Sequence, residues 1–205
     1  MTSPSILRRP VRPPPTEPTF DRLVRTAREL FARDGFSGTS LDAVVAACGL
    51  TKGALYHHFG SKTELFTAVF EDEAAGLSDR VASAMREDEA SWEGAFTGIR
   101  AFLHESQDHG VQRIMLLDGP SVLGWEGVRE IEGEYGLALI KDTLAGLMAA
   151  GLMPSRDVET LAHLLFGAMC EGAMLIARSD DPSGALTAVE DGLRHLISGL
   201  AARPN

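Results

Sequence analysis

Apolar residues recur every three or four positions along almost the whole chain, which is the spacing of one face of an α-helix. The first such stripe runs over residues 20–31, and we expect this helix to end at Gly35 in a left-handed conformation. No segment alternates apolar and polar residues with a period of two, as a half-buried strand would. The pattern therefore predicts an all-α fold of about nine helices, with an N-terminal three-helix unit and a C-terminal helical body.

Two short helices separated by a tight turn follow the first helix. One apolar stripe covers residues 41–48, where Thr39 or Ser40 is the expected N-cap, and Gly49 makes the turn. A second stripe covers residues 51–59 and starts at a threonine cap. Each stripe is narrow, so each short helix is expected to pack against a single neighbour, which is the first helix. This order predicts a helix-turn-helix, whose second helix enters the major groove of DNA.

Capping signals mark where the later helices begin. Ser61-Lys62-Thr63-Glu64 has the spacing of a capping box and opens a long helix that reaches about Val81. Asp118-Gly119-Pro120 is expected to end the helix over residues 111–117. Asp181 followed by Pro182 starts the last helix. Further stripes predict helices over residues 91–103, 111–117, 125–148, 158–178 and 185–200.

The segment Leu161–Ala177 is apolar on nearly all sides. A helix of this kind is buried all round or lies in a membrane. Because it contains His163 and Glu171 and the rest of the chain is amphipathic, we expect no membrane partner. Burial between its own domain and a second subunit is the alternative we favour. With the last helix it would form a four-helix bundle across a two-fold axis, so a homodimer through the last two helices is predicted.

Charge is divided unequally along the chain. The formal net charge is -10, from 19 Lys and Arg against 29 Asp and Glu. Residues 1–64 hold nine basic and six acidic residues, so their net is 9 − 6 = +3, and the rest carry 10 − 23 = -13. DNA responds to the charge of the patch that faces it, since exposed charges are screened within about 10 Å at 0.1 M salt. The acidic body is therefore expected to face away from the duplex.

These observations divide the chain into three parts. Residues 1–18 are rich in proline and arginine and predict a disordered arm. Residues 19–64 are the predicted DNA-binding domain, and residues 65–205 the predicted ligand-binding and dimerisation domain.

The second short helix carries side chains suited to DNA. Lys52 can donate to guanine or phosphate, Gly53 lets the backbone approach a base edge closely, and Tyr56 and His57 can donate to phosphate.

The run LDAVVAACGLTKGALYHHFGSKTELF, residues 41–66, resembles the DNA-binding domain of tetracycline-repressor (TetR) family regulators. The matching positions are Gly49, Thr51, Lys52, Gly53, Leu55, Tyr56, His58, Phe59, Ser61, Lys62 and Leu65. The resemblance covers about residues 19–70 and implies a homodimeric, ligand-responsive transcriptional repressor that binds a palindromic operator. It implies that DNA is faced by Lys52, Gly53, Tyr56, His57 and Lys62, with Ser40 and Thr51 at the phosphates. His57 stands where the family more usually has an aromatic residue, and His58 packs on the domain or reaches a phosphate.

Aromatic and methionine side chains are frequent in the predicted body. Taken singly each is a core residue, but together they predict a soft, largely apolar cavity with a few polar groups, as an inducer site requires. The candidate lining residues are Trp92, Phe96, Phe102, Met115, Trp125, Met148, His163, Phe166, Cys170 and Glu171. A buried Glu171 would need a ligand or protein partner unless it faces a solvent gap at the dimer interface. The segment Leu116–Trp125 is a gate or pocket wall, or only a corner between helices.

Enzyme chemistry is poorly supported. The sequence has no GxSxG, no P-loop and no GxGxxG after a strand, and its histidines form no His-x-x-x-His pair with acidic neighbours. We therefore expect no catalytic residues, cofactor or metal. Two cysteines cannot build a disulfide framework, which favours a reducing cytoplasm and, for a DNA-binding protein, the nucleoid. The alternative function is a helical dimeric interaction or small-molecule-binding protein without sequence-specific DNA binding.

Overall fold

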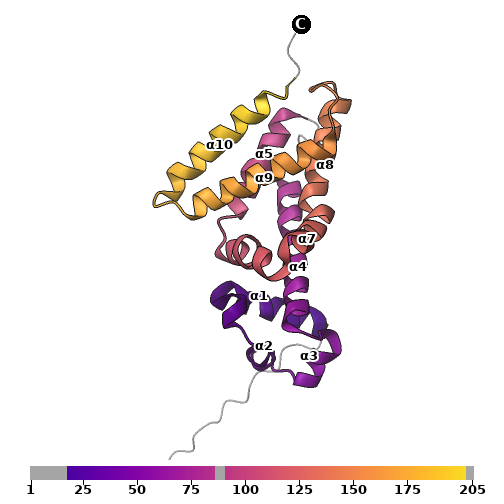
Figure 1. Cartoon of the computed structure of the whole chain (residues 1–205), viewed down its shortest axis with the longest axis vertical. Helices are drawn as coiled ribbons and strands as arrows, with labels where there is room; N and C mark the ends of the chain where they lie inside the picture. Colours follow the sequence, from indigo (N-terminus) through magenta and orange to yellow (C-terminus); the bar gives the residue numbers. More distant parts are fainter. Residues whose placement is uncertain (1–17, 86–90, 202–205) are drawn as a thin grey trace, which may run out of the picture.

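The computed structural model describes residues 18–85 and 91–201, which form helices joined by short turns (Figure 1). The predicted N-terminal arm lies, except for its last residue, outside the described residues. The elements are α1 (Thr19–Gly38), α2 (Leu41–Cys48), α3 (Lys52–His58), α4 (Lys62–Met85), α5 (Trp92–Glu105), α6 (His109–Val111), the π-helix η1 (Gln112–Asp118), α7 (Gly119–Glu134), α8 (Gly136–Ala149), α9 (Val158–Ala177) and α10 (Pro182–Ser198).

The predicted all-α fold of about nine helices is confirmed. Because α6, η1 and α7 follow one another without a gap, the described part of the chain contains nine continuous helical stretches. In Figure 1, α1, α2 and α3 lie at one end of the molecule and α8, α9 and α10 at the other, while α4 runs from the first group into the second.

Side-chain caps define the short helices as the sequence predicts. The hydroxyl of Ser40 accepts a hydrogen bond from the Ala43 amide at 3.1 Å, and that of Thr51 accepts one from the Ala54 amide at 3.2 Å. Between them Gly49 is left-handed, with φ 64° and ψ 33°. Each cap satisfies an amide that the helix itself leaves unpaired, which is why these residue types mark the starts.

The start of α4 also follows the predicted capping box. The Ser61 hydroxyl accepts from the Glu64 amide at 3.0 Å. The Glu64 carboxylate reaches back to the amide of Gly60, at 2.8 Å, rather than to that of Ser61. Both bonds serve the same purpose, since each satisfies a free amide at the junction between α3 and α4.

The end of α1 differs from the prediction. Gly35 has the expected positive φ of 73°, but its ψ of 171° is not that of a left-handed helical residue, and the helix resumes for a last turn to Gly38. The positive φ is what requires glycine here, because the atoms that a Cβ would meet belong to the guanidinium of Arg113, the movable end of a long side chain. The guanidinium of Arg113 in η1 thus lies directly against the backbone of Gly35.

The middle of the chain corrects two further predictions. Asp118-Gly119-Pro120 does not interrupt the helical path, because Gly119 is itself helical (φ -49°, ψ -59°). Pro120 stands in the first turn of α7, where its missing amide hydrogen bond is not required. The kink comes instead at Gly124, with φ 71° and ψ 175°. The single helix predicted over residues 125–148 is divided at Tyr135, whose φ of -119° and ψ of -92° separate α7 from α8.

Two hydrophobic cores share the helix α4. The first half of α4 packs with α1, α2 and α3 in an N-terminal core that also takes in side chains of η1 and α7. The second half of α4 packs with α5, α8, α9 and α10 in a C-terminal core. A displacement of α4 is therefore felt in both cores, because close-packed interiors transmit strain.

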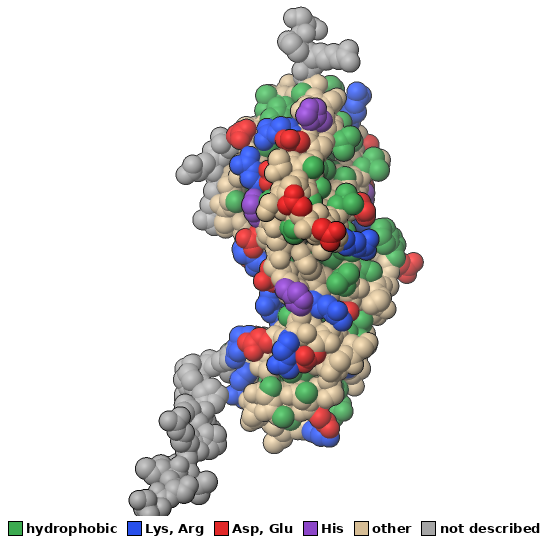
Figure 2. Space-filling view, turned by 90° about the vertical axis from the view of Figure 1, so that its left-hand side faces the viewer, with side chains coloured by type: hydrophobic (Ala, Val, Ile, Leu, Met, Phe, Trp, Pro, Cys, Tyr) green, Lys and Arg blue, Asp and Glu red, His purple; other side chains and the backbone are tan. Residues whose placement is uncertain are grey.

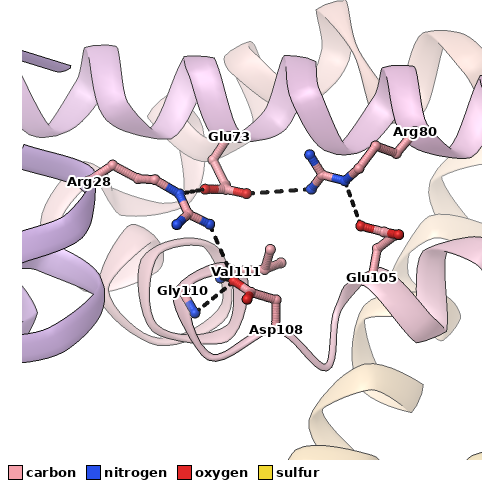
Figure 3. Close-up of polar contacts among 7 residues, drawn as sticks. All are labelled: Arg28, Glu73, Arg80, Glu105, Asp108, Gly110 and Val111. Carbon is pink, nitrogen blue, oxygen red and sulfur yellow. Dashed lines mark hydrogen bonds and ion pairs between the residues drawn. The ribbon is translucent and has the colours of Figure 1, made fainter. Parts of the chain in front are cut away.

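A row of ion pairs lies between the two cores (Figure 3). Glu73 of α4 is buried, with a side chain 4% exposed, and accepts from Nε of Arg28 of α1 at 2.6 Å. Its other oxygen lies 3.6 Å from Nη2 of Arg80, which also pairs with Glu105 of α5 at 2.5 Å. Arg28 reaches Asp108 as well, at 3.3 Å, and this carboxylate caps α6. These bonds join α1, α4, α5 and the start of α6.

Within a single chain the helix α9 is buried along one side, and its burial between its own domain and a second subunit stays a prediction. It packs on α5, α8 and α10, and Gly172 lets α10 approach so closely that a Cβ there would lie 2.6 Å from Val189. Leu164 and Leu175, however, are 66% and 55% exposed on the opposite side. By length and composition α9 could also cross a membrane, with 33% of its most apolar window buried in the chain. A core or interface helix satisfies the same criteria, and its three packed neighbours favour that interpretation.

Candidate DNA-binding face and ligand cavity

The outward face of α3 is held rigidly from behind. Leu55 is fully buried and Phe59, which follows the helix, is 4% exposed, so both anchor α3 in the N-terminal core. The opposite side of α3 presents Lys52, Gly53 and Tyr56, all exposed, and Tyr56 retains 57% of its accessible surface. A helix that is exposed along one side and anchored along the other is able to enter a groove without unfolding.

Lys52 already has a partner within the helix-turn-helix. Its Nζ lies 2.8 Å from the carboxylate of Asp42 at the start of α2. The hydrogen bond that Lys52 donates to the Asp42 carboxylate is the main reason that the pKa of Lys52 is raised. Both side chains are largely exposed, so the pair can open at little cost when a phosphate or base offers another acceptor.

The remaining predicted DNA contacts have different surroundings. Ser40, Thr51 and His57 are exposed, and each of the two hydroxyls keeps its own proton for donation after accepting its capping bond. Lys62 is half-buried, and its Nζ donates to the carbonyl oxygens of Phe36 at 2.8 Å and Thr39 at 3.0 Å. The ammonium therefore secures the end of α1 against α4.

His58, which the sequence assigns either to the domain or to a phosphate, is exposed. Its ring contacts Phe20 edge-on, with centroids 6.1 Å apart. Phe20 in turn lies 5.2 Å from Phe59, so the three rings close the N-terminal core below α3.

The body contains two adjoining apolar cavities. The Trp92 cavity lies between α4, α5, α8 and α9, and the Glu132 cavity lies between α4, α7, α8 and α9. Each has a volume of about 50 Å³. They share four lining residues, which are Val81, Leu139, Ile140 and Met169. An outer hollow, lined by Trp125, Arg129 and Glu171 among others, adjoins the Glu132 cavity through Met115 and Glu132.

Seven of the ten predicted lining residues border these spaces. Trp92 lines the Trp92 cavity, while Phe102, Met115 and Phe166 line the Glu132 cavity. Trp125, Cys170 and Glu171 line the outer hollow, as Met115 also does. Glu171 is exposed in the single chain, so it needs no buried partner of the kind that its place in an apolar helix predicts. The segment Leu116–Trp125 contributes to the wall of this hollow rather than to the cavities.

The other three predicted residues have structural surroundings instead. Phe96 stacks on Trp92 with a centroid distance of 6.2 Å, and the guanidinium of Arg194 covers it at 4.1 Å. Met148 is half-buried at the margin of the C-terminal core. His163 is exposed and lies 3.1 Å from the Glu159 carboxylate one turn earlier. None of the three borders the cavities or the outer hollow.

The charged group among the described residues that line the inner cavities is Glu132, which the sequence did not reveal. Its side chain is 10% exposed, and its Oε2 accepts from Nη1 of Arg129 at 3.1 Å. Burial raises the pKa of Glu132 to about 7, against the lowering effect of Arg129. Burial likewise raises the pKa of the neighbouring Cys170 thiol to about 12, which leaves it unreactive at neutral pH. The overlooked signal is that Glu132 continues the apolar stripe of Trp125 and Val128.

Family models match both halves of the chain. The model described as bacterial regulatory proteins of the tetR family matches residues 23–69, and the one described as tetracyclin repressor-like C-terminal domain matches residues 92–200. The chain belongs to the TetR family of transcriptional regulators. It is therefore a regulator and not an enzyme. Among the described residues, no group of three or more His, Cys, Asp or Glu side chains is placed to hold a metal ion.

Relatives of this TetR-family chain match most of its length or a shorter part of it. The crystal structure of a TetR-family transcriptional regulator from Pectobacterium atrosepticum is 33% identical, with 91% of this chain and 96% of that chain covered and a TM-score of 0.77. The transposon Tn10 TetC protein of Escherichia coli is 25% identical over 73% of this chain and 75% of its own length. The transcriptional regulator UidR of Escherichia coli K12 is 38% identical over 63 residues, which are 30% of this chain and 32% of UidR.

Proposed function

We propose that this TetR-family regulator is a homodimeric repressor that binds a palindromic operator and leaves it when a small molecule enters its body. The observation that carries the DNA-binding part is the exposed face of α3, anchored by Leu55 and Phe59 within the residues that the family model matches. Because family members bind DNA and act in the cell interior, a cytoplasmic location at the nucleoid accompanies the proposal.

Each DNA-facing side chain has a proposed role. Lys52 leaves Asp42 and donates to a base or phosphate, and Gly53 allows the backbone to approach a base edge. Tyr56 and His57 donate to phosphate oxygens, while the hydroxyls of Ser40 and Thr51 do so from the starts of α2 and α3. The bonds of Lys62 to Phe36 and Thr39 support a positioning role for it, with any phosphate contact limited to its remaining N–H.

The face formed by α9 and α10 supports a dimer. Of the seven large hydrophobic side chains exposed in the described residues, Leu164, Leu175 and Leu196 belong to these two helices. Leu196 is the most exposed of these three leucines, at 69%. Figure 2, which looks onto the side of α10, shows hydrophobic side chains spread over the upper half of this face between charged ones. A second copy of the same face would cover these leucines across a two-fold axis.

Two connections support release by a ligand. The helix α4 lines both inner cavities with Val81 and holds Phe66 and Phe70 in the N-terminal core. The π-helix η1 lines the Glu132 cavity with Met115, and its last residue Asp118 accepts from the Phe36 amide of α1 at 2.7 Å. Since the cavities are small, a ligand enters by displacing side chains of the helices around them, and α4 and η1 are two of these helices.

Such a displacement changes the spacing of the two α3 helices in a dimer, which must match half-sites about 34–36 Å apart. The difference in ligand affinity between the two spacings provides the coupling, typically about 1–3 kcal/mol.

A mobility-shift titration with duplexes that tile the region upstream of the gene tests the DNA-binding face. Tyr56→Ala and Lys52→Ala should each weaken binding by at least about tenfold, since each removes a contact worth on the order of 1–3 kcal/mol. Lys141→Ala is the matched control, because it removes the same charge from α8 of the body. Equal affinity of all four proteins for the duplexes would contradict the proposed DNA-binding face.

A further inference from the structure

The inner cavities form one elongated, almost entirely apolar space. The Trp92 cavity and the Glu132 cavity adjoin through Leu139 and Ile140 of α8 on one side and Val81 of α4 on the other. Aliphatic and aromatic side chains make up most of the lining, with Ser78 and Thr143 as hydroxyl groups. A slender molecule fits this shape, with one end near Trp92 and the other near Glu132.

Glu132 is the one charged side chain among the described residues that line the two cavities. Its side chain is 10% exposed, and its hydrogen bond from Arg129 uses one oxygen, Oε2. A buried carboxylate is costly unless it is fully paired, and Arg129 supplies only part of this pairing, through a single N–H. The cavity therefore contains an acceptor with capacity for another donor.

Arg129 serves the outer hollow rather than the inner cavities. Its guanidinium lies over the Trp125 ring at 4.2 Å and 5.3 Å from the Phe166 ring centre. It lines the outer hollow but neither inner cavity. A molecule inside the cavities consequently meets the carboxyl of Glu132 and not the guanidinium, so a ligand anion would face a like charge in surroundings of low polarity.

We propose that the joined cavities bind a slender apolar molecule with a single cationic nitrogen, which pairs with Glu132 while the tail lies between α4 and α8 toward Trp92. This assignment rests on the proposed ligand-responsive function and names the chemical class of its ligand. The volume of about 50 Å³ in each cavity means that such a tail enters by moving Met169 and Leu139, which border both cavities, and thus by loosening the contacts of α4.

The charge state of Glu132 gives the proposal a second consequence. The charged or titratable groups around it are Arg129 of α7 and Cys170 of α9, together with the exposed Glu171, which lines the same outer hollow. The raised pKa of Cys170 keeps its thiol neutral throughout the neutral range. Since burial raises the pKa of Glu132 to about 7, its carboxyl is partly protonated near neutral pH and must release its proton to solvent before it pairs with a cation. Cation binding should therefore strengthen between pH 6 and pH 8.

Octylammonium, octanol and octanoate are matched probes, because they share one tail and differ in the charge of the head. Binding to the full chain is measured by calorimetry and by the fluorescence of its two tryptophans, of which Trp92 lines a cavity. Octylammonium should bind at least about tenfold more tightly than either other probe, and more tightly at pH 8 than at pH 6. In Glu132→Gln this preference should fall to less than about twofold, with octanol unaffected.

Glu126→Gln is the matched control, since Glu126 lies on the same helix and is exposed. It should retain the preference for octylammonium. Octanoate or octanol binding as tightly as octylammonium to the unaltered protein would overturn the proposal, even if Glu132→Gln did not fold. The proposal would also be overturned if Glu132→Gln, shown by circular dichroism to be folded, preferred octylammonium as strongly as the unaltered protein does.

Operator release is measured separately, by mobility shift, so that the two proposals can fail independently. Octylammonium that binds through Glu132 but leaves DNA bound supports the cation site and contradicts its role in release. Release by octanol that is equally strong in Glu132→Gln contradicts the cation site and leaves ligand-driven release in place.

Discussion

Replacement of Arg28 by methionine should destabilise the protein far more than its surface position implies. Methionine keeps most of the aliphatic length but leaves Glu73, whose side chain is 4% exposed, with Arg80 at 3.6 Å as its remaining partner. Removal of one member of a buried pair costs on the order of 3–5 kcal/mol. Because Arg80 stays near and Arg28 is itself 35% exposed, we expect a loss near the lower end, about 3 kcal/mol.

A double-mutant cycle separates the pair from general packing effects. Glu73→Leu removes the buried charge itself and should cost only about 1–2 kcal/mol, and the double variant should be no worse than Glu73→Leu alone. The coupling between the two positions should then be about 3 kcal/mol, the whole of the Arg28→Met loss. Urea unfolding followed by circular dichroism, at one fixed protomer concentration, measures all four free energies of unfolding.

Arg33→Met is the control for this cycle. Arg33 lies on the same helix and pairs with Asp34 at the surface, where its side chain is 68% exposed. We expect no measurable change in the free energy of unfolding. Our reasoning would be refuted by an Arg28→Met loss no greater than that of Arg33→Met, or by single losses that simply add in the double variant.

Three further predictions concern pH, DNA and assembly. The pKa of Glu132 in the folded chain, about 7, is above its ordinary value, so its contribution to stability is greatest below about pH 4.5 and is lost as the pH rises to 7. Relative to the unaltered protein, Glu132→Gln should accordingly gain on the order of 3 kcal/mol between pH 5 and pH 8, and urea titrations that show no such trend would contradict the burial effect. In anisotropy titrations, Asp42→Asn should tighten DNA binding several-fold at low salt, because it frees Lys52 and removes a negative charge near phosphate. Asp142→Asn, which removes the same charge from the body, should leave DNA affinity unchanged in the same titrations. Leu196→Arg should convert a dimer to a monomer in sedimentation equilibrium, and Leu117→Arg, which is also at an exposed leucine, should leave the dimer intact.

The features that the sequence predicts well are local. Ser40, Thr51 and Asp181 cap the helices that follow them because each needs only an amide two or three residues further on. The apolar stripes locate the helices for the same reason, since helical periodicity is a property of neighbouring residues. The exposed face of α3 follows from the same stripes, because Leu55 and Phe59 define which side is anchored.

The features that the sequence does not predict depend on distant partners. Lys62 resembles a phosphate ligand in the motif, yet the carbonyls that hold it belong to the end of α1, whose path is set by Gly35 and Arg113. Glu132 resembles a surface residue until α8 and α9 close over it. The apolar sequence of α9 predicts that the helix is buried on most sides. Its periodicity does not say whether the same chain or a second subunit buries each side.

The ratio of operator affinity to non-specific affinity tests the central claim most directly. Fluorescence anisotropy would be measured at one salt concentration with the upstream palindrome and with a shuffled duplex of equal length and composition. Our account predicts a ratio of at least about 10³ for the dimer and a large loss of that ratio in Tyr56→Ala. A ratio near one, unchanged in Tyr56→Ala, would contradict sequence-specific recognition by α3.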